Sequence, residues 1–188
     1  GQTMNPSVEG VLEAAEAAGS EQVIVLPNNK NIIATAQQAA ASNPAMQVVL
    51  SATIPQGVAA LLAFNPEGPW QENVKSMTSA LSGVVSVEVT TAVRSVSING
   101  MEVNEGQYIG LLDGELATAE ENAEAALRAT LDIAGLTPDA IVTVYCGAGR
   151  SPSDAVSFSA ALEKEFPGIQ VDLFEGGQPH YQYLASVE

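Results

Sequence analysis

Three short polar segments carry the side chains of this sequence that could bind a ligand or a partner protein. They cover residues 2–5, 28–31 and 53–56, and each leads into an expected helix. In a parallel α/β sheet such turns lie at the carboxyl ends of the strands, where ligands bind. Helix N-termini add N–H donors and a partial positive charge that suit a carboxylate or a phosphate. Asn and Thr are also ordinary helix caps, so both interpretations stay open at this point.

The residues of this expected surface offer amides, hydroxyls and one ammonium group, without an acid–base pair. Four consecutive polar residues follow Pro27, which is more than capping alone requires. A Gly-rich polar segment near the end of the chain is expected to line the second half similarly. The predicted ligand- or partner-binding residues are Thr3, Asn28, Asn29, Lys30, Asn31, Gln56, Gly176, Gly177 and Gln178. No catalytic residue and no metal ligand is predicted.

The segment CGAGRS, residues 146–151, raises the alternative of a cysteine phosphatase. In such enzymes a loop between a strand and a helix holds a thiolate nucleophile beside an Arg. That loop needs five residues between Cys and Arg, whereas only three separate Cys146 from Arg150, and Tyr145 stands where a His is usual. A buried structural Cys146 and a surface Arg150 are therefore the favoured interpretations.

His180 is the one histidine and the conventional candidate for a general base near neutral pH. No Ser or Cys is spaced so that a pairing with it can be inferred, so it is expected to be an incidental residue. The sequence also lacks a Walker loop, a dinucleotide-binding fingerprint and an HExxH motif. These motifs therefore do not add up to a self-sufficient active site.

Composition narrows the class of protein further. The 188 residues include six Lys+Arg against 22 Asp+Glu, a formal net charge of −16, which disfavours nucleic acid and anionic membranes as partners. A single Cys excludes an internal disulfide, and one His leaves no zinc-ligand cluster. No apolar run approaches the ~20 residues that span a bilayer. A globular cytoplasmic protein is expected.

The first 63 residues predict alternating helices and strands. Asn5 and Pro6 suit the cap and first position of a helix closed by Gly19. QVIVLP and MQVVLSA then predict short buried strands, each followed by a helix, the second capped by Thr53 with Gln56 as its capping-box partner. The chain therefore begins at a strand-to-helix turn, and the alternation predicts a parallel sheet.

The pattern changes after an expected helix over residues 69–83. Alternating residues and the dipeptides Asn99-Gly100 and Asp113-Gly114 predict two hairpins. Thr118 and Glu121 predict a capping box for a helix that ends near Ala134. A buried strand over 140–147, a helix from Ser151 and two terminal strands complete the expected order.

Several phrases of the sequence resemble a known bacterial family in order along essentially the whole chain. They are GQTMNPS, VIVLPNNKNIIATAQQAA, IPQGVAALLAFNPE, EVTTAVR, YIGLLDG and GGQPHYQYLASVE. They resemble the C-terminal domain of the ATP-binding component of fatty acid kinase, which is a dihydroxyacetone-kinase-like protein with a DAK2 domain. The resemblance implies that ATP and magnesium bind in an N-terminal domain missing from this chain, which itself needs no cofactor. It also implies a partner, a fatty-acid-binding carrier of the DegV family, whose fold this chain should share.

The sequence and the resemblance together predict an α/β fold of two similar parallel-sheet lobes, residues 1–83 and 84–188, with an antiparallel hairpin insertion. The expected function is non-catalytic docking of the carrier, so that its acyl carboxylate is phosphorylated by ATP held elsewhere in the parent kinase. A domain that senses a small carboxylate or phosphate at the same loops is the alternative. An enzyme that uses Cys146 is the weakest hypothesis.

Overall fold

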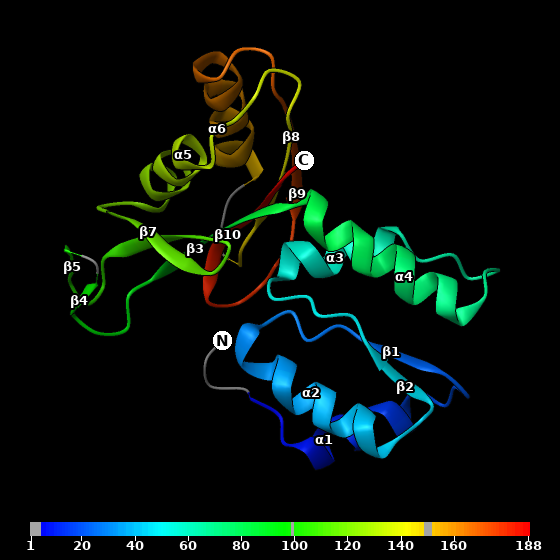
Figure 1. Ribbon diagram of the computed structural model, residues 1–188. Coiled ribbons are helices and arrows are strands. Elements are labelled where there is room, and N and C mark those ends of the chain that lie inside the picture. Colours follow the sequence, from blue (N-terminus) through cyan, green and yellow to red (C-terminus); the bar gives the residue numbers. More distant parts are fainter. Residues whose placement is uncertain (1–4, 99, 149–151) are drawn as a thin grey trace. The chain divides into compact units, whose positions relative to one another are not determined.

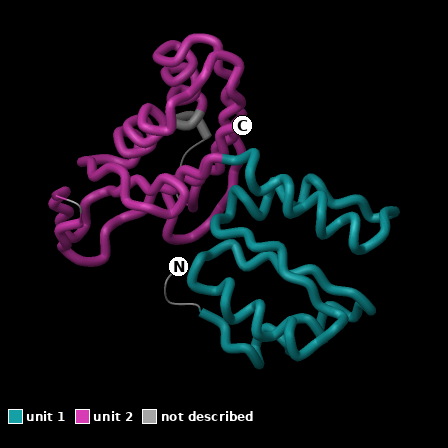
Figure 2. Tube along the Cα trace, viewed as in Figure 1, with its two compact units in different colours: residues 1–84 teal, residues 85–188 magenta. Residues whose placement is uncertain are grey.

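The computed structural model describes residues 5–98, 100–148 and 152–188, and it divides the chain into two compact units. Unit 1 spans Gly1–Val84 and unit 2 spans Val85–Glu188 (Figure 2). This division lies one residue from the expected boundary. Among the described helices none is both long and apolar enough to cross a membrane.

Unit 1 is a small two-stranded parallel sheet with helices on both faces (Figure 1). Its elements are α1 (Val8–Ala17), β1 (Val23–Val25), α2 (Lys30–Ser42), β2 (Met46–Val48), α3 (Ile54–Leu62), α4 (Trp70–Ala80) and the 3-10 turn η1 (Leu81–Gly83). Val23 and Val25 pack against α1 and α2, whereas Ile24 and Leu26 pack against α3 and α4. Alternate side chains of β1 thus point to opposite faces of the sheet, and helices cover both faces. A continuous apolar run is typical of a strand that is buried on both faces.

Unit 2 is a six-stranded mixed sheet. Its elements are β3 (Val85–Thr91), β4 (Val96–Ile98), β5 (Met101–Val103), β6 (Tyr108–Leu112), β7 (Glu115–Glu120), α5 (Ala123–Ala134), β8 (Ile141–Cys146), α6 (Pro152–Glu165), β9 (Gln170–Glu175) and β10 (Tyr181–Val187). The strand order is β7-β6-β3-β10-β8-β9, and β4 and β5 pair separately as a hairpin. Only the β8–β9 pair of the six-stranded sheet is parallel.

The expectation of two similar parallel-sheet lobes is therefore confirmed only in part, because β8 and β9 of unit 2 pair in parallel whereas the other pairs of its six-stranded sheet are antiparallel. Parallel neighbours need a crossover connection of a dozen or more residues, and α6 supplies one between β8 and β9. The segment between β9 and β10 is short, so β10 returns antiparallel to β8 and β3. The α/β class itself and the hairpin insertion are confirmed.

The core of unit 2 lies between one face of the sheet and the helices α5 and α6. On three neighbouring strands, β3, β10 and β8, every second side chain faces this core. Tyr183 and Ala185 of β10, for example, lie beside Cys146 and Val144 of β8. Leu127 of α5 and Leu162 of α6 are fully buried against them. The ring of Tyr183 stacks on Phe158 at 5.8 Å between centroids, and its hydroxyl bonds to Glu124 at 3.0 Å.

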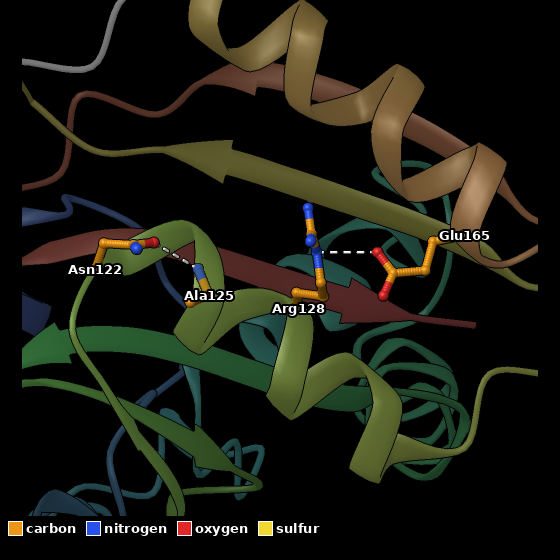
Figure 3. A network of polar contacts seen from close by, with 4 residues as sticks. All are labelled: Asn122, Ala125, Arg128 and Glu165. Atoms are coloured by element: carbon orange, nitrogen blue, oxygen red, sulfur yellow. Dashed lines mark hydrogen bonds and ion pairs between the residues drawn. The ribbon is translucent and has the colours of Figure 1, made fainter.

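The two helices of unit 2 are also joined at their surface (Figure 3). Arg128 of α5 forms an ion pair with Glu165 of α6, with 2.9 Å between Nε and Oε2. Both side chains are more than two-fifths exposed, so solvent screens this pair and it contributes little to stability. The buried apolar contacts beneath it hold the helices in place.

The predicted hairpin turns are confirmed, whereas the predicted cap of the first helix is wrong. Asp113 and Gly114 have φ of 48° and 80°, as a tight two-residue hairpin turn requires, which confirms the β6–β7 hairpin. The β4–β5 hairpin is also present, although Asn99 lies outside the described residues. The N-terminal cap is Ser7, not Asn5, because the Ser7 hydroxyl accepts the N–H of Gly10 at 3.0 Å.

The predicted capping box at Thr118 is wrong, because Thr118 belongs to β7. The helix starts at Ala123 with Asn122 as its cap, which accepts the N–H of Ala125 at 2.8 Å (Figure 3). The Thr118 hydroxyl is buried and lies 2.8 Å from the hydroxyl of Thr130 in α5. Thr118 therefore serves the packing of α5 on the sheet instead of the start of the helix.

Gly110 of β6 allows this close contact between sheet and helix. A Cβ at Gly110 would overlap the hydroxyl oxygens of Thr118 and Thr130. We expect Gly110→Ala to lower the free energy of unfolding by about 1–3 kcal/mol in urea denaturation, because the buried pair has to separate. Gly83→Ala is the control, since a Cβ there meets nothing within 4 Å. Equal effects of the two substitutions would contradict this account of the contact.

Candidate functional site

The polar segments after β1 and β2 meet at the carboxyl ends of these parallel strands. The side-chain oxygen of Asn28 accepts the hydroxyl proton of Ser51 at 2.6 Å. In return the Ser51 hydroxyl accepts the backbone N–H of Asn28 at 3.1 Å. Ser51 is fully buried, so this reciprocal pair closes the edge of the sheet away from water. Of the three polar segments expected at one edge, 28–31 and 53–56 thus follow neighbouring strands, while residues 2–4 of the first lie outside the described residues.

Asn28 adopts an unusual backbone conformation to make this contact. Its φ is 53°, in the left-handed region that Asn tolerates better than most residues. Its side chain lies against the backbone of α3, where a Cβ at Gly57 would overlap the amide. Sequence reasoning missed Ser51 and Gly57, because only the folded loops bring them to Asn28. A glycine inside a short helix was the available signal of a close approach.

The neighbouring polar side chains are used as helix caps. Asn29 accepts the N–H of Asn31 at 2.9 Å and so caps α2. Thr53 caps α3 by accepting the N–H of Gln56 at 3.3 Å. The Gln56 amide oxygen accepts the N–H of Ala52 at 2.8 Å, one residue before the position that a capping box uses.

What the site presents to solvent is therefore smaller than the set of predicted residues. Lys30 and Asn31, in the first turn of α2, are exposed, whereas Asn28, Asn29 and Gln56 are half-buried. The ammonium group of Lys30 thus stands beside a loop whose other polar groups are fixed by internal hydrogen bonds. Thr3 lies outside the described residues.

The predicted Gly-rich segment, residues 176–178, belongs to unit 2 and forms hydrogen bonds with the end of β8. The backbone N–H groups of Gly176 and Gly177 both donate to the carbonyl of Cys146, at 2.9 and 3.0 Å. The side-chain amide of Gln178 donates to the carbonyl of Tyr145 at 2.9 Å, and its backbone carbonyl accepts the N–H of Ala148 at 3.1 Å. This segment thereby fixes the turn from β9 to β10, and its polar groups are largely occupied.

Cys146 and His180, the residues considered for catalysis, lie in different environments: Cys146 is buried and His180 is exposed. Cys146 is buried in the core of unit 2, and Arg150 lies outside the described residues. His180 has a φ of 71°, and its carbonyl accepts the hydroxyl proton of Thr90 at 2.7 Å. The backbone of His180 thus links the start of β10 to β3, and the residue is exposed.

Two tyrosines of unit 2 have perturbed acidity. Burial raises the pKa of Tyr145, and the charge of Glu188 adds to this effect. Burial likewise raises the pKa of Tyr181, with a smaller contribution from Glu88. Both shifts favour the neutral phenol at physiological pH, so neither hydroxyl is prepared to act as a base.

Among the described residues, no group of three or more His, Cys, Asp or Glu side chains is placed to hold a metal ion. Gly57, within α3, lies against the side-chain amide of Asn28, and Gly176, in the turn after β9, lies against the side chain of Gln178, so protein groups occupy the space beside both glycines.

Solved structures similar to this chain include proteins described as binding fatty acids and a kinase. A Thermotoga maritima protein described as having a fatty acid binding function matches with a TM-score of 0.63 at 14% identity, over 98% of this chain and 76% of its own. The Streptococcus pneumoniae fatty acid kinase B3 protein loaded with linoleic acid gives 0.61 at 15%, over 97% and 75%. The dihydroxyacetone kinase of C. freundii gives 0.60 at 14%, over 97% and 41%. DegV-family structures match as well, so the chain has the fold of DegV and dihydroxyacetone-kinase-like proteins.

The family itself follows from sequence. Residues 1–188 match the model of the FakA-like C-terminal family, the C-terminal domain of fatty acid kinase-like proteins, and the chain belongs to this family. It is 38% identical over 189 residues to protein YloV of Bacillus subtilis (strain 168) and 36% identical to an uncharacterized protein of Staphylococcus haemolyticus. Each match covers all of this chain and 34% of the relative, so the chain spans about a third of the length of these curated relatives. The resemblance stated from the sequence is confirmed.

The contact between Asn28 and Gly57 can be tested by a double-mutant cycle. We expect Gly57→Ala to lower the free energy of unfolding by about 1–3 kcal/mol, because the new methyl group displaces the Asn28 amide. Asn28→Gly keeps a residue suited to the positive φ and removes the overlapping amide. The double variant should therefore lose less stability than the two single losses combined. Strict additivity in urea denaturation would show that the residues do not interact.

The buried position of Cys146 predicts low thiol reactivity. In the folded chain, reaction with a disulfide reagent at neutral pH should be about a hundredfold or more slower than in the chain unfolded by urea. The unfolded chain is the internal control, because it contains the same single thiol. A folded-state rate equal to that of the unfolded chain would contradict the burial and revive a reactive role for Cys146.

Proposed function

We propose that this chain is the docking domain of a fatty acid kinase-like protein and has no catalytic chemistry of its own. In this proposal it binds a fatty-acid-loaded carrier of the DegV family. The carrier's acyl carboxylate is then phosphorylated by ATP and magnesium held in another part of the longer protein. Membership of the family supports the proposal, and so does the share of its relatives' length that the chain spans.

The observation that carries the proposal is the internally hydrogen-bonded loop beside Lys30. Asn28 and Ser51 lock the loop from within, and Asn29 fixes the start of α2. A surface that is rigid before binding loses little conformational entropy when a partner docks. A lysine at its rim suits a partner with negative charge at that point, and gives orientation and association rate more than affinity.

The docking proposal predicts a charge-sensitive interaction. We expect Lys30→Glu to raise the dissociation constant for a lipid-loaded DegV-family carrier roughly three- to tenfold in titration calorimetry. The substitution should leave the fold intact, because Glu is favourable in the first turn of a helix. Lys75→Glu makes the same charge change at a side chain that is 76% exposed on α4, and it should bind normally.

Two outcomes would count against docking at this loop. Equal weakening by Lys30→Glu and Lys75→Glu would mean that only the overall charge matters. Absence of binding by the wild-type chain would remove the docking role. A thermal shift with free fatty acids or small carboxylates would then support the alternative of a ligand-sensing domain.

A further inference from the structure

A groove of about 410 Å³ lies within unit 2, between β7, β5 and α5, which Figure 1 shows at the same side of this unit. β7 contributes the four consecutive residues 117–120, and β5 contributes Met101 and Glu102. The C-terminal part of α5 contributes residues that include Asp132 and Ile133. Successive side chains of a strand point to opposite faces of its sheet. A groove that touches four successive residues of β7 therefore follows the edge of this strand instead of lying over one face.

The edge of β7 suits pairing with another extended chain. β7 is an end strand of the six-stranded sheet, so one edge of its backbone has no strand partner within that sheet. The outward N–H and C=O groups of such an edge are a template for a further strand. The register of β7 shifts at Ala117, and beyond this bulge Thr118, Ala119 and Glu120 pair regularly with β6. Residues 118–120 therefore have the regular geometry that an added strand requires.

The ionisable side chains of the groove are all acidic. They are Glu102, Glu120 and Asp132. None of the three forms an ion pair with a Lys or Arg of the described part of the chain. Arg128, the one basic residue of α5, is paired with Glu165 of α6 instead. The groove thus carries negative charge that no described cation neutralises, and its electrostatic complement is a cationic ligand.

Asp132 occupies a position where a carboxylate is unfavourable for its own helix. It lies in the last turn of α5, which ends at Ala134 and contains no basic residue. The helix dipole places partial negative charge at this end, so the helix would be more stable with a neutral or cationic side chain. Residues that violate a local preference without benefit to the fold are expected at functional sites. A cation in the groove would offset this cost.

The spacing of the carboxylates and the identity of the edge restrict the ligand further. Within the described residues no three acidic side chains are placed to hold one metal ion, so the groove suits several separate cationic groups better than a single small ion. A second copy of β7 would bring its own Glu120 to the same edge, and like charges disfavour such pairing. Bulges also protect strand edges against pairing with identical edges. An extended chain with cationic side chains meets the edge and the carboxylates together.

We propose that this groove binds an extended, cationic segment of a partner protein, which adds a strand to the edge of β7. The backbone of the segment pairs with residues 118–120, and its Lys or Arg side chains lie beside the three carboxylates. An apolar side chain of the segment packs on Ile133, which is 54% exposed. This surface belongs to unit 2, and none of its lining residues belongs to the loop beside Lys30, so it does not depend on the docking role proposed above.

The first test uses the synthetic peptide Arg-Val-Lys-Val-Arg-Val, blocked at both ends, and the full 188-residue chain. In titration calorimetry we expect saturable binding that weakens as salt is raised. Glu120→Lys should weaken binding about fivefold or more, because it places a cation in the groove. Glu121→Lys is the matched control, since this exposed neighbour does not line the groove, and it should change binding less than about twofold.

The second test separates binding from stability at Asp132. Asp132→Asn removes a negative charge from the last turn of α5, so thermal unfolding followed by circular dichroism should show a chain at least as stable as the wild type. The same substitution should weaken peptide binding about threefold. Lower stability with unchanged binding would show that Asp132 serves the fold and not the groove.

The third test asks whether the backbone of β7 pairs with the peptide. The same peptide methylated on every backbone nitrogen keeps its charges and loses its N–H donors, so it should bind at least about tenfold more weakly. Amide hydrogen exchange of residues 118–120 should slow when the unmodified peptide binds. Exchange in β9, the other end strand of the sheet, should not change and is the internal control.

Several results would overturn the proposal. They are absence of saturable binding, equal effects of Glu120→Lys and Glu121→Lys, equal affinity for the two peptides, or slower exchange in β9 instead of β7. Full displacement of the peptide by spermine at similar concentration would assign the groove to small polycations instead of a protein segment.

Discussion

The position of β10 is the constraint on which the second unit depends. This last strand lies between β3 and β8, and its backbone pairs antiparallel with both. It also supplies Tyr183 and Ala185 to the core under α5 and α6. Without β10 the two neighbouring strands would each expose an unpaired edge, and the core would open between them. The segment 176–178, just before β10, is held at the end of β8 by hydrogen bonds, and this positions β10 between β8 and β3.

In unit 1 the polar residues that first suggest chemistry are largely used to build the site. Asn28 and Ser51 bond to each other, Asn29 and Thr53 cap helices, and Gln56 holds the backbone of Ala52. Groups held in this way are poorly suited to transfer protons, because their lone pairs and hydrogens are already occupied. They are well suited to hold this surface in one conformation, which is the property that the proposed docking role requires.

The accuracy of the sequence-based predictions depended on how local each signal was. The Asp113-Gly114 turn was predicted correctly, because the conformations that it needs are set by those two residues. The cap at Thr118 was predicted wrongly, because Asn122 lies four residues further on and Thr130 offered the Thr118 hydroxyl a buried partner. A cap is a competition between neighbours, and a tertiary contact can decide it.

The sequence by itself determined the family, the order of helices and strands, and the burial of a lone Cys146, since these depend on periodicity, turn residues and recognisable phrases. The tertiary structure alone decided that unit 2 is largely antiparallel, that Gly57 must be small beside Asn28, and that the buried N–H of Trp70 has no hydrogen-bond partner among the described residues. The physical reason is the range of the interactions. Propensity and capping act within a few residues, whereas strand direction, close approach and satisfaction of buried donors depend on residues that are distant in the sequence.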